Sequence, residues 1–281
     1  MPTKILIDSG SDINKFEAEK LGVILLPIEV NFGGETYMDG DTILAHEFYE
    51  KLESVKELPK TSQINNYRFN EEFTKHTADG SDIVYLSLSS RISGTYNNAR
   101  LTAEDFNGKV CVVDTLNAST GMRVLVEYAI RLRDQGLNAS KIAEKLEKVK
   151  SKVRVVAMID TLKYLKMGGR ISGAAALIGG MLSIKPMIGV IEGEIKVIGK
   201  CVGAKKAFAY IIDQVKKEGV DLSMPHAYIN SGNDLSNYNS FITTTEEIYG
   251  ADHLNIAGHT LGATIGTHIG SGAVGVAYFA K

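Results

Sequence analysis

The stretch from Ile83 to Ala99 reads IVYLSLSSRISGTYNNA. It opens with four apolar residues, continues through a hydroxyl-rich loop from Ser87 to Thr95, and ends in residues that favour a helix. This pattern predicts a strand, a loop and a helix start. A helix N-terminus carries unpaired N–H groups and a partial positive charge, so hydroxyls and a glycine placed there suit a carboxylate or a phosphate. An ordinary helix cap explains the same serines equally well.

The flanking sequence predicts strands that alternate with helices. The predicted strands are Lys4–Asp8, Val23–Phe32, Val110–Val113 and Val153–Ile159. The predicted helices are Asp12–Lys20, Ala45–Val55, Tyr67–His76, Ser119–Gln135 and Ser140–Val149. Because this alternation is typical of parallel sheets covered by helices, we expect residues 1–150 to form an N-terminal parallel α/β domain.

The pattern changes after residue 150. Gly173–Leu182 is an apolar segment rich in alanine and glycine, and Ile184–Ile198 predicts a hairpin around a Glu-Gly-Glu turn. Further helices are predicted at Ala204–Lys217 and Leu235–Ile248, and strands at Ala227–Asn230, Leu254–Ala257 and Ala273–Phe279. We therefore expect residues 151–281 to form a second α/β domain with a mixed or antiparallel sheet.

Composition excludes several classes of protein. The chain has 281 residues, a net charge of -2 and no basic run, which argues against nucleic-acid binding. Cys111 and Cys201 lie in apolar runs without metal-ligand spacing, so we expect reduced thiols. No apolar run is long enough for a membrane span, and Met1 is followed closely by a strand rather than by a leader peptide. These features predict a cytoplasmic protein without an integral membrane segment.

Polar side chains gather at several predicted strand ends, where open α/β sheets bind ligands. A second hydroxyl cluster, Lys60–Gln63, is expected to open the helix that follows it. His268 lies in a sequence that predicts a glycine-rich turn, where an imidazole could approach a ligand, although a structural loop histidine fits as well. Turns and caps also account for most of these polar residues.

Common catalytic and metal-binding motifs fail in their context. Gly270–Gly275 matches G-x-G-x-x-G, but no helix follows it as dinucleotide binding requires. Gly193–Cys201 resembles a P-loop but lacks its spacing and its magnesium-binding hydroxyl. The histidines show no ligand spacing, so we expect no metal.

Several segments together resemble the DegV family, in the order in which that family carries them. They are Lys60–Gln63, Leu88–Ser90, Ser93–Tyr96, Asp160–Leu162, Gly168–Ile171, Ile184–Pro186 and His268. The resemblance covers nearly the whole chain. It departs from the family at Ile64-Asn65 and at Ser271, which affects loop shape rather than any expected ligand.

The resemblance implies a bacterial two-domain protein that binds a long-chain fatty acid between its domains. Such a protein is the non-catalytic subunit of a fatty-acid kinase: it presents the carboxylate to a separate ATP-dependent subunit that makes acyl phosphate for phospholipid synthesis. It needs no cofactor, and its lipid ligand leaves room for transient contact with a membrane surface. The implied carboxylate-binding residues are Thr61, Ser62, Ser93, Gly94, Thr95 and His268. Arg170 is implied as a ligand or partner contact.

The physical chemistry of such a ligand agrees with this interpretation. At about 0.8 kcal/mol per buried CH₂, roughly fifteen methylenes supply on the order of 12 kcal/mol before binding costs. The tail would therefore give the affinity and the hydroxyls the orientation. We expect most of the tunnel wall from the second domain, with Gly173–Ile188 as a candidate segment that ordinary core packing explains equally well.

An enzyme is the alternative. Ser93 and His268 would then carry out phosphotransfer or hydrolysis on a small hydroxylated substrate, because a serine nucleophile needs an adjacent base. A hydrogen bond between Ser93 and His268 in a short open cleft would favour the enzyme. A narrow apolar tunnel would favour the carrier.

Overall fold

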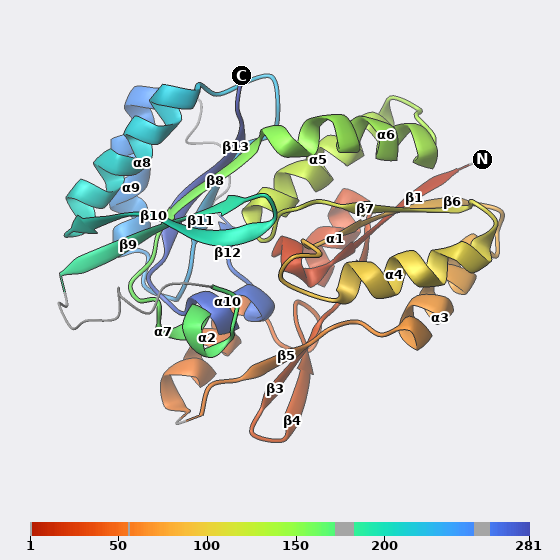
Figure 1. Cartoon of the computed structure of the whole chain (residues 1–281). Helices are drawn as coiled ribbons and strands as arrows, with labels where there is room; N and C mark the ends of the chain where they lie inside the picture. The colour runs from red at the N-terminus through yellow and green to blue at the C-terminus, as the bar shows by residue number, and fades with distance from the viewer. Residues whose placement is uncertain (1, 56, 172–182, 250–258) are drawn as a thin grey trace.

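A computed structural model of the chain describes residues 2–55, 57–171, 183–249 and 259–281. Two sheets with flanking helices form most of the molecule, and a small third sheet projects from them (Figure 1). The α/β fold class expected from the sequence is confirmed. Short 3-10 turns link some elements: η1 (Ser9–Ser11), η2 (Glu104–Phe106) and η3 (Lys150–Lys152).

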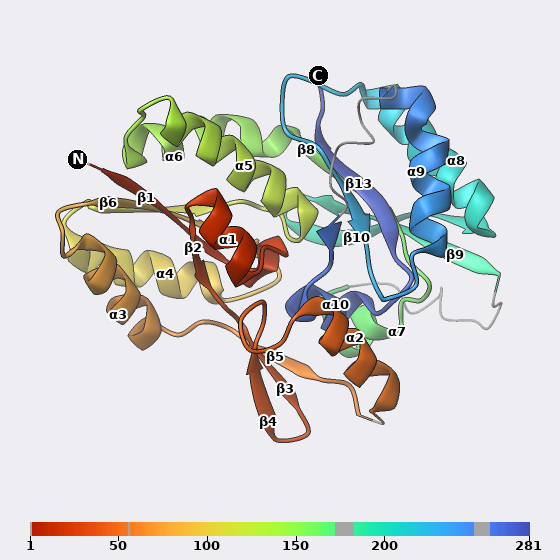
Figure 2. The ribbon, with the colours of Figure 1, turned by 180° about the vertical axis from the view of Figure 1, so that it is seen from behind.

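The first sheet is parallel throughout, in the order β2-β1-β6-β7. Its strands are β1 (Thr3–Asp8), β2 (Ile24–Leu26), β6 (Asp82–Ser87) and β7 (Val110–Asp114). The helices around it are α1 (Lys15–Leu21), α3 (Asn66–Thr77), α4 (Thr95–Ala103), α5 (Thr120–Asp134) and α6 (Ala139–Val149). Figures 1 and 2 show α3 and α4 on one face and α5 and α6 on the other. This double cover explains the nearly continuous apolar runs of β1 and β6.

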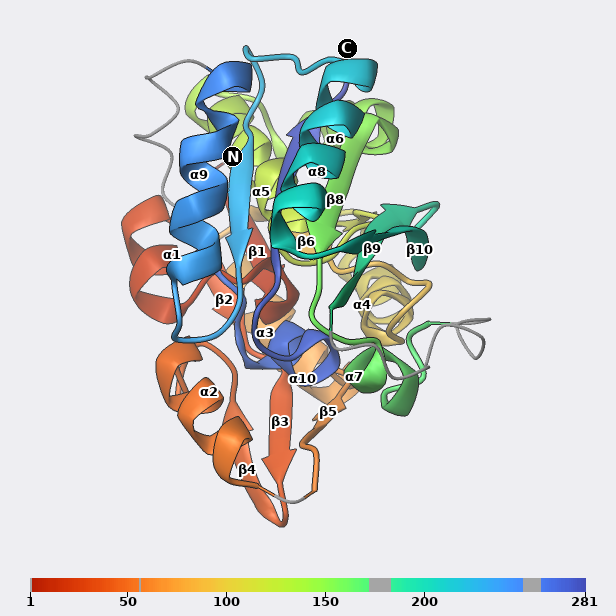
Figure 3. The same ribbon diagram turned by 90° about the vertical axis from the view of Figure 1, so that its left-hand side faces the viewer.

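The second sheet is mixed, in the order β10-β9-β8-β13-β11-β12, and only β11 and β12 pair in parallel. Its strands are β8 (Val153–Met158), β9 (Ile184–Ile191), β10 (Glu194–Val202), β11 (Ala227–Asn230), β12 (His259–Thr260) and β13 (Val274–Phe279). Helices α8 (Ala204–Glu218) and α9 (Ser236–Tyr249) cover one face (Figure 3). The whole of Gly173–Leu182 and the strand predicted at Leu254–Ala257 lie outside the described residues.

The third sheet was not predicted. It is antiparallel, in the order β4-β3-β5, and consists of β3 (Glu29–Phe32), β4 (Glu35–Met38) and β5 (Lys60–Ser62). The single strand expected over Val23–Phe32 is wrong: the chain breaks at Pro27, β2 joins the parallel sheet and β3 joins this one. Proline lacks the N–H that a continuous ladder needs.

This third sheet, together with α2 (Ala45–Ser54), packs on elements from the other end of the chain. Phe48 and Tyr49 of α2 share a buried core with Ala263 of α10 (Ala263–Ile269), and Tyr164 of α7 (Lys163–Met167) packs against the same core. Figures 1 and 3 show α7 and α10 beside α2 and above the β3–β4 hairpin. The division into domains 1–150 and 151–281 remains a prediction.

Candidate functional site

Ser93 stands just before α4, in the loop that leaves β6. Gly94 is the N-cap residue of α4, and Thr95 is its first residue. The Ser93 Oγ lies 3.0 Å from the Thr95 Oγ1 and accepts a hydrogen bond of 3.3 Å from the Thr95 backbone N–H. Ser93 and Gly94 line a cavity, whereas Thr95 is fully buried behind them and does not.

Thr61 approaches the same cavity from the third sheet. The expectation that Lys60–Gln63 opens a helix is wrong, because residues 60–62 form β5 and the helix is capped by Asn65. Successive side chains of a strand point to opposite faces, which leaves Thr61 partly buried and Ser62 exposed at the rim. The Thr61 Oγ1 lies 3.0 Å from the His268 Nε2.

His268 belongs to helix α10 rather than to the turn expected from its glycines. The residues of α10 and its approach that line the cavity recur at helical spacing: Leu261, Thr264, Ile265, His268 and Ile269. The glycines lie on other faces and allow close packing. A Cβ at Gly266 would lie 2.5 Å from Phe48, and one at Gly262 would lie 2.9 Å from the Asp39 carboxylate.

Two buried carboxylates hold the start of α10. Asp39 accepts hydrogen bonds from the N–H groups of Ala263 (2.8 Å) and Thr264 (2.9 Å), and Asp12 accepts one from Gly262 (2.8 Å). Burial raises the pKa of Asp12 to about 7 and also raises the pKa of Asp39. No local sequence pattern links Asp39 to a helix more than 220 residues away, so the sequence alone did not identify this contact.

The imidazole of His268 is neutral at physiological pH. Burial and, to a smaller extent, the nearby Arg170 cation lower its pKa to about 4. Its Nδ1 is buried without a hydrogen-bond partner and packs against Gly168, where a Cβ would collide with it.

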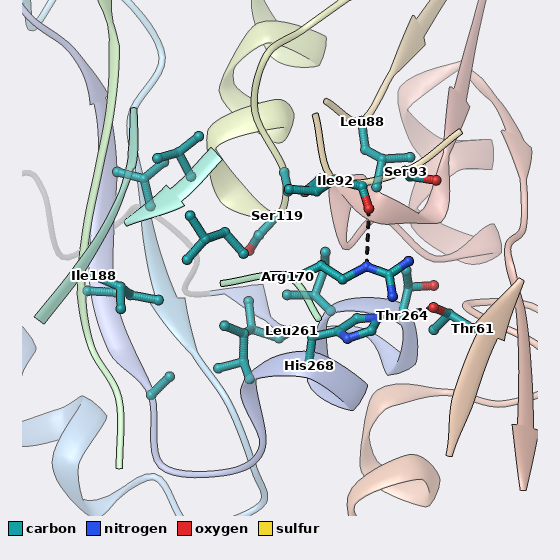
Figure 4. A pocket seen from close by; sticks show the side chains of 18 of the residues that line it. Thr61, Leu88, Ile92, Ser93, Ser119, Arg170, Ile188, Leu261, Thr264 and His268 are labelled. Carbon is teal, nitrogen blue, oxygen red and sulfur yellow. Dashed lines mark hydrogen bonds between the residues drawn. The ribbon is translucent and has the colours of Figure 1, made fainter. Parts of the chain in front are cut away.

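Arg170 forms the wall between the cavity and two hollows on the outside. Its Nε donates to the Ile92 carbonyl (3.2 Å; Figure 4) and its Nη1 to the Gly168 carbonyl (2.6 Å). It lines the inner cavity, an outer hollow beside Ser93 and another beside Thr61 and His268. Among the described residues it has no carboxylate partner, so its positive charge stays uncompensated.

The cavity has a volume of about 330 Å³ and lies between the two large sheets and α10. Figure 4 shows Ser93, Thr61, His268 and Arg170 toward one end, Ser119 in the middle, and aliphatic side chains such as Ile188 toward the other end. Its apolar lining consists of Ile28, Leu88, Ile92, Ala118, Val155, Ala157, Ile159, Ile188, Val190, Ile195, Ile229, Leu261, Ile265, Ile269 and Ala273. Most of these residues follow residue 150, and Ile188 represents the candidate tunnel segment. A volume near 300 Å³ is enough for a small organic ligand.

The arrangement does not assemble a serine nucleophile with a base. In the part of the chain that the structure describes, His268 bonds Thr61, and Ser93 bonds Thr95. Over the same residues, no three His, Cys, Asp or Glu side chains are grouped to hold a metal ion. The geometry expected for the enzyme alternative is therefore missing.

Comparison with known proteins identifies the family. A family model described as an uncharacterised protein, DegV family, matches residues 2–281. The chain belongs to the DegV family. A DegV domain-containing protein of Deinococcus radiodurans is 32% identical over 281 residues, which cover 99% of this chain and 98% of that one.

Solved DegV structures share the whole fold. A fatty-acid-binding DegV family protein from Thermus thermophilus matches with a TM-score of 0.86 and 29% identity, and the match covers 100% of both chains. A stearic acid-binding protein from Eubacterium ventriosum matches with a TM-score of 0.81 and 26% identity, over 100% of this chain and 99% of that one. None of the described helices of this DegV protein is both long and apolar enough to span a bilayer.

Proposed function

We propose that this DegV protein binds a long-chain fatty acid in the cavity, with its carboxylate bound by Ser93 and Thr61 and with His268 beside them. The observation that carries the proposal is a cavity with mostly aliphatic walls and with the Ser93 and Thr61 side chains at one end (Figure 4). Gly94 and Ser62 would border the carboxylate, while Thr95 would act through Ser93. Fatty-acid binding by the proteins from Thermus thermophilus and Eubacterium ventriosum supports this assignment.

We also propose that the protein presents the carboxylate to a separate ATP-dependent kinase subunit, which forms acyl phosphate for phospholipid synthesis in the cytoplasm. Two features support a non-catalytic role: among the described residues Ser93 is paired with Thr95 rather than with a base, and the polar end lies next to outer hollows that share Ser93, Thr61 and Arg170 with the cavity. Neutral hydroxyls suit this role, because a bidentate arginine–carboxylate pair would hold the head group more tightly.

Mass spectrometry of the purified, denatured protein tests the proposal directly, and we expect a co-purified fatty acid. For oleate titrated by calorimetry, Ser93→Ala should weaken binding by about 10- to 100-fold, because a hydrogen bond to a charged group contributes about 1.5–3 kcal/mol. Ser90→Ala, which borders an outer hollow but not the cavity, is the matched control. Washed protein that contains no fatty acid and binds neither oleate nor palmitate would exclude the carrier.

A reconstituted reaction tests the kinase role separately. The loaded protein, a fatty-acid kinase catalytic subunit and ATP should yield acyl phosphate, and the protein alone with ATP should yield none. Oleate binding without any acyl phosphate would reject the partner while leaving the lipid site intact.

A further inference from the structure

Two of the hydroxyls that line the cavity, those of Ser93 and Thr61, each have a buried partner that decides which way the hydroxyl proton points. We propose that Thr95 and His268 are positioning residues that make Ser93 and Thr61 hydrogen-bond donors toward the cavity, so that its polar end selects an anionic head group. The inference rests on the proposed fatty-acid function and adds the basis of head-group selection.

Thr95 sets the direction of the Ser93 hydroxyl. The Thr95 Oγ1 is buried, and it accepts a hydrogen bond from the Ile64 backbone N–H (3.3 Å). Within the described residues, its own proton has one acceptor, the Ser93 Oγ at 3.0 Å. If Ser93 donated instead, Thr95 would keep a buried O–H without an acceptor, which is unfavourable. Ser93 therefore accepts from Thr95, and its own proton is available to the cavity that it lines.

His268 sets the direction of the Thr61 hydroxyl in the same way. Its buried Nδ1 has no partner, and an unpaired buried lone pair is better tolerated than an unpaired N–H. The proton of the neutral ring then resides on Nε2 and is donated to the Thr61 Oγ1 at 3.0 Å. Thr61, having accepted this bond, has its proton free for a ligand.

The segment that carries Thr61 also supports Ser93. Ile64 follows β5 by two residues, its N–H bonds Thr95, and its carbonyl accepts from the Asn98 side chain at 2.7 Å. The Ser93 hydroxyl therefore depends on the segment after β5 as well as on α4, whereas the Thr61 hydroxyl depends on α10. A carboxylate or an acyl phosphate can accept from both protons, and bonds to an ionised acceptor are about twice as strong as neutral ones.

Calorimetry with oleate and oleyl alcohol tests this selection in the full chain. Thr95→Val keeps the side-chain shape but removes the hydroxyl, so oleate affinity should fall about tenfold and oleyl alcohol affinity less than threefold. Thr95→Ser restores the hydroxyl and should stay within threefold of wild type for both ligands. Equal losses for both ligands in Thr95→Val, or a Thr95→Ser variant as weak as Thr95→Val, would overturn the role of Thr95. If Thr95→Val does not fold, Thr95→Cys, a weaker donor, replaces it with the same criterion.

Nitrogen-15 NMR of His268 in the wild-type protein tests the second half without a mutation. At pH 7 we expect a protonated Nε2 and an unprotonated Nδ1, and a proton on Nδ1 would overturn the assignment. If wild type binds neither ligand, the proposed function fails, and the NMR result still decides the orientation of Thr61.

Discussion

The polar end of the cavity has two arms: the Ser93 arm is Ser93 with Thr95, and the Thr61 arm is Thr61 with His268. Each arm directs a hydroxyl proton toward the cavity, but the two are supported by different contacts. Ser93 is oriented by Thr95, two residues along the chain. Thr61 is oriented by His268, 207 residues away. The first pair needs the loop, the first turn of α4 and the Ile64 N–H, but no contact with α10. The second pair exists only when the third sheet is packed against α10.

The Thr61 arm forms because specific contacts hold the third sheet and α2 against α10. Asp39 follows β4 and accepts two N–H groups of α10, while Phe48 and Tyr49 fill the space left by Gly266. The Thr61 arm should therefore fail whenever this contact loosens, and the Ser93 arm should survive. The following variants test that asymmetry.

Removing the carboxylate of Asp39 should lower the free energy of unfolding more than any of the substitutions that follow. Asp39→Ala leaves two buried N–H groups without acceptors, and we expect unfolding free energy to fall by about 4 kcal/mol, because each hydrogen bond to a charged group contributes about 1.5–3 kcal/mol. Urea denaturation measures the loss. Hydrogen exchange should accelerate in residues 263–269 and remain unchanged in residues 95–103.

Asp41→Ala is the matched control. Asp41 lies two residues away and forms an exposed ion pair with Lys15, so its loss should cost less than about 0.5 kcal/mol. Equal acceleration of exchange in α4 and α10 upon Asp39→Ala would show that the two arms are not independent.

The same asymmetry explains which parts of the site could be predicted from the sequence. The Ser93 arm could be predicted, since its strand, its hydroxyl-rich loop and its N-cap glycine are adjacent in the chain. The parallel sheet and the β9–β10 hairpin were equally accessible, because short-range periodicity and turn residues determine them.

The Thr61 arm was misread because its determinants are non-local. β5 has three residues and is a strand only because β3 lies beside it. In α10 the glycines suggested a turn, although residues 261, 264, 265, 268 and 269 already showed helical spacing. Family resemblance pointed to His268 without revealing the helix that carries it or the carboxylate that anchors that helix.

Titration of His268 should make the stability of the protein depend on pH. Its folded pKa of about 4 lies below the unfolded value of 6.5, so the folded state binds fewer protons between these values and loses stability as the pH falls from 6.5 to 4. We expect the stability of wild type relative to His268→Gln to fall by on the order of 2–3 kcal/mol over this range. Urea denaturation of both proteins at several pH values measures it.

The stability of wild type must be compared with that of His268→Gln because titration of Asp12 changes the stability of both proteins in the opposite direction. Its raised pKa, about 7, makes its contribution fall as the pH rises from about 4 to 7, and subtraction removes that term. His46→Gln, at an exposed histidine outside the site, is the control. A wild-type to His268→Gln difference that stays constant from pH 4 to 7 would contradict a buried neutral imidazole.

Alanine substitutions at one glycine beside each arm compare the contributions of the two arms to oleate binding, and each adds only a methyl group. Gly94 and Gly168 both have right-handed helical backbone angles, so alanine adds only a Cβ. At Gly168 this Cβ collides with the His268 ring, which is fixed by Thr61, whereas at Gly94 it meets the end of the exposed Gln63 side chain, which can move away. Gly168→Ala should weaken oleate binding about tenfold, as loss of one hydrogen bond of about 1.4 kcal/mol would. Gly94→Ala should weaken it less than Gly168→Ala does, because Gln63 can move away, and the reverse order would contradict the role of His268.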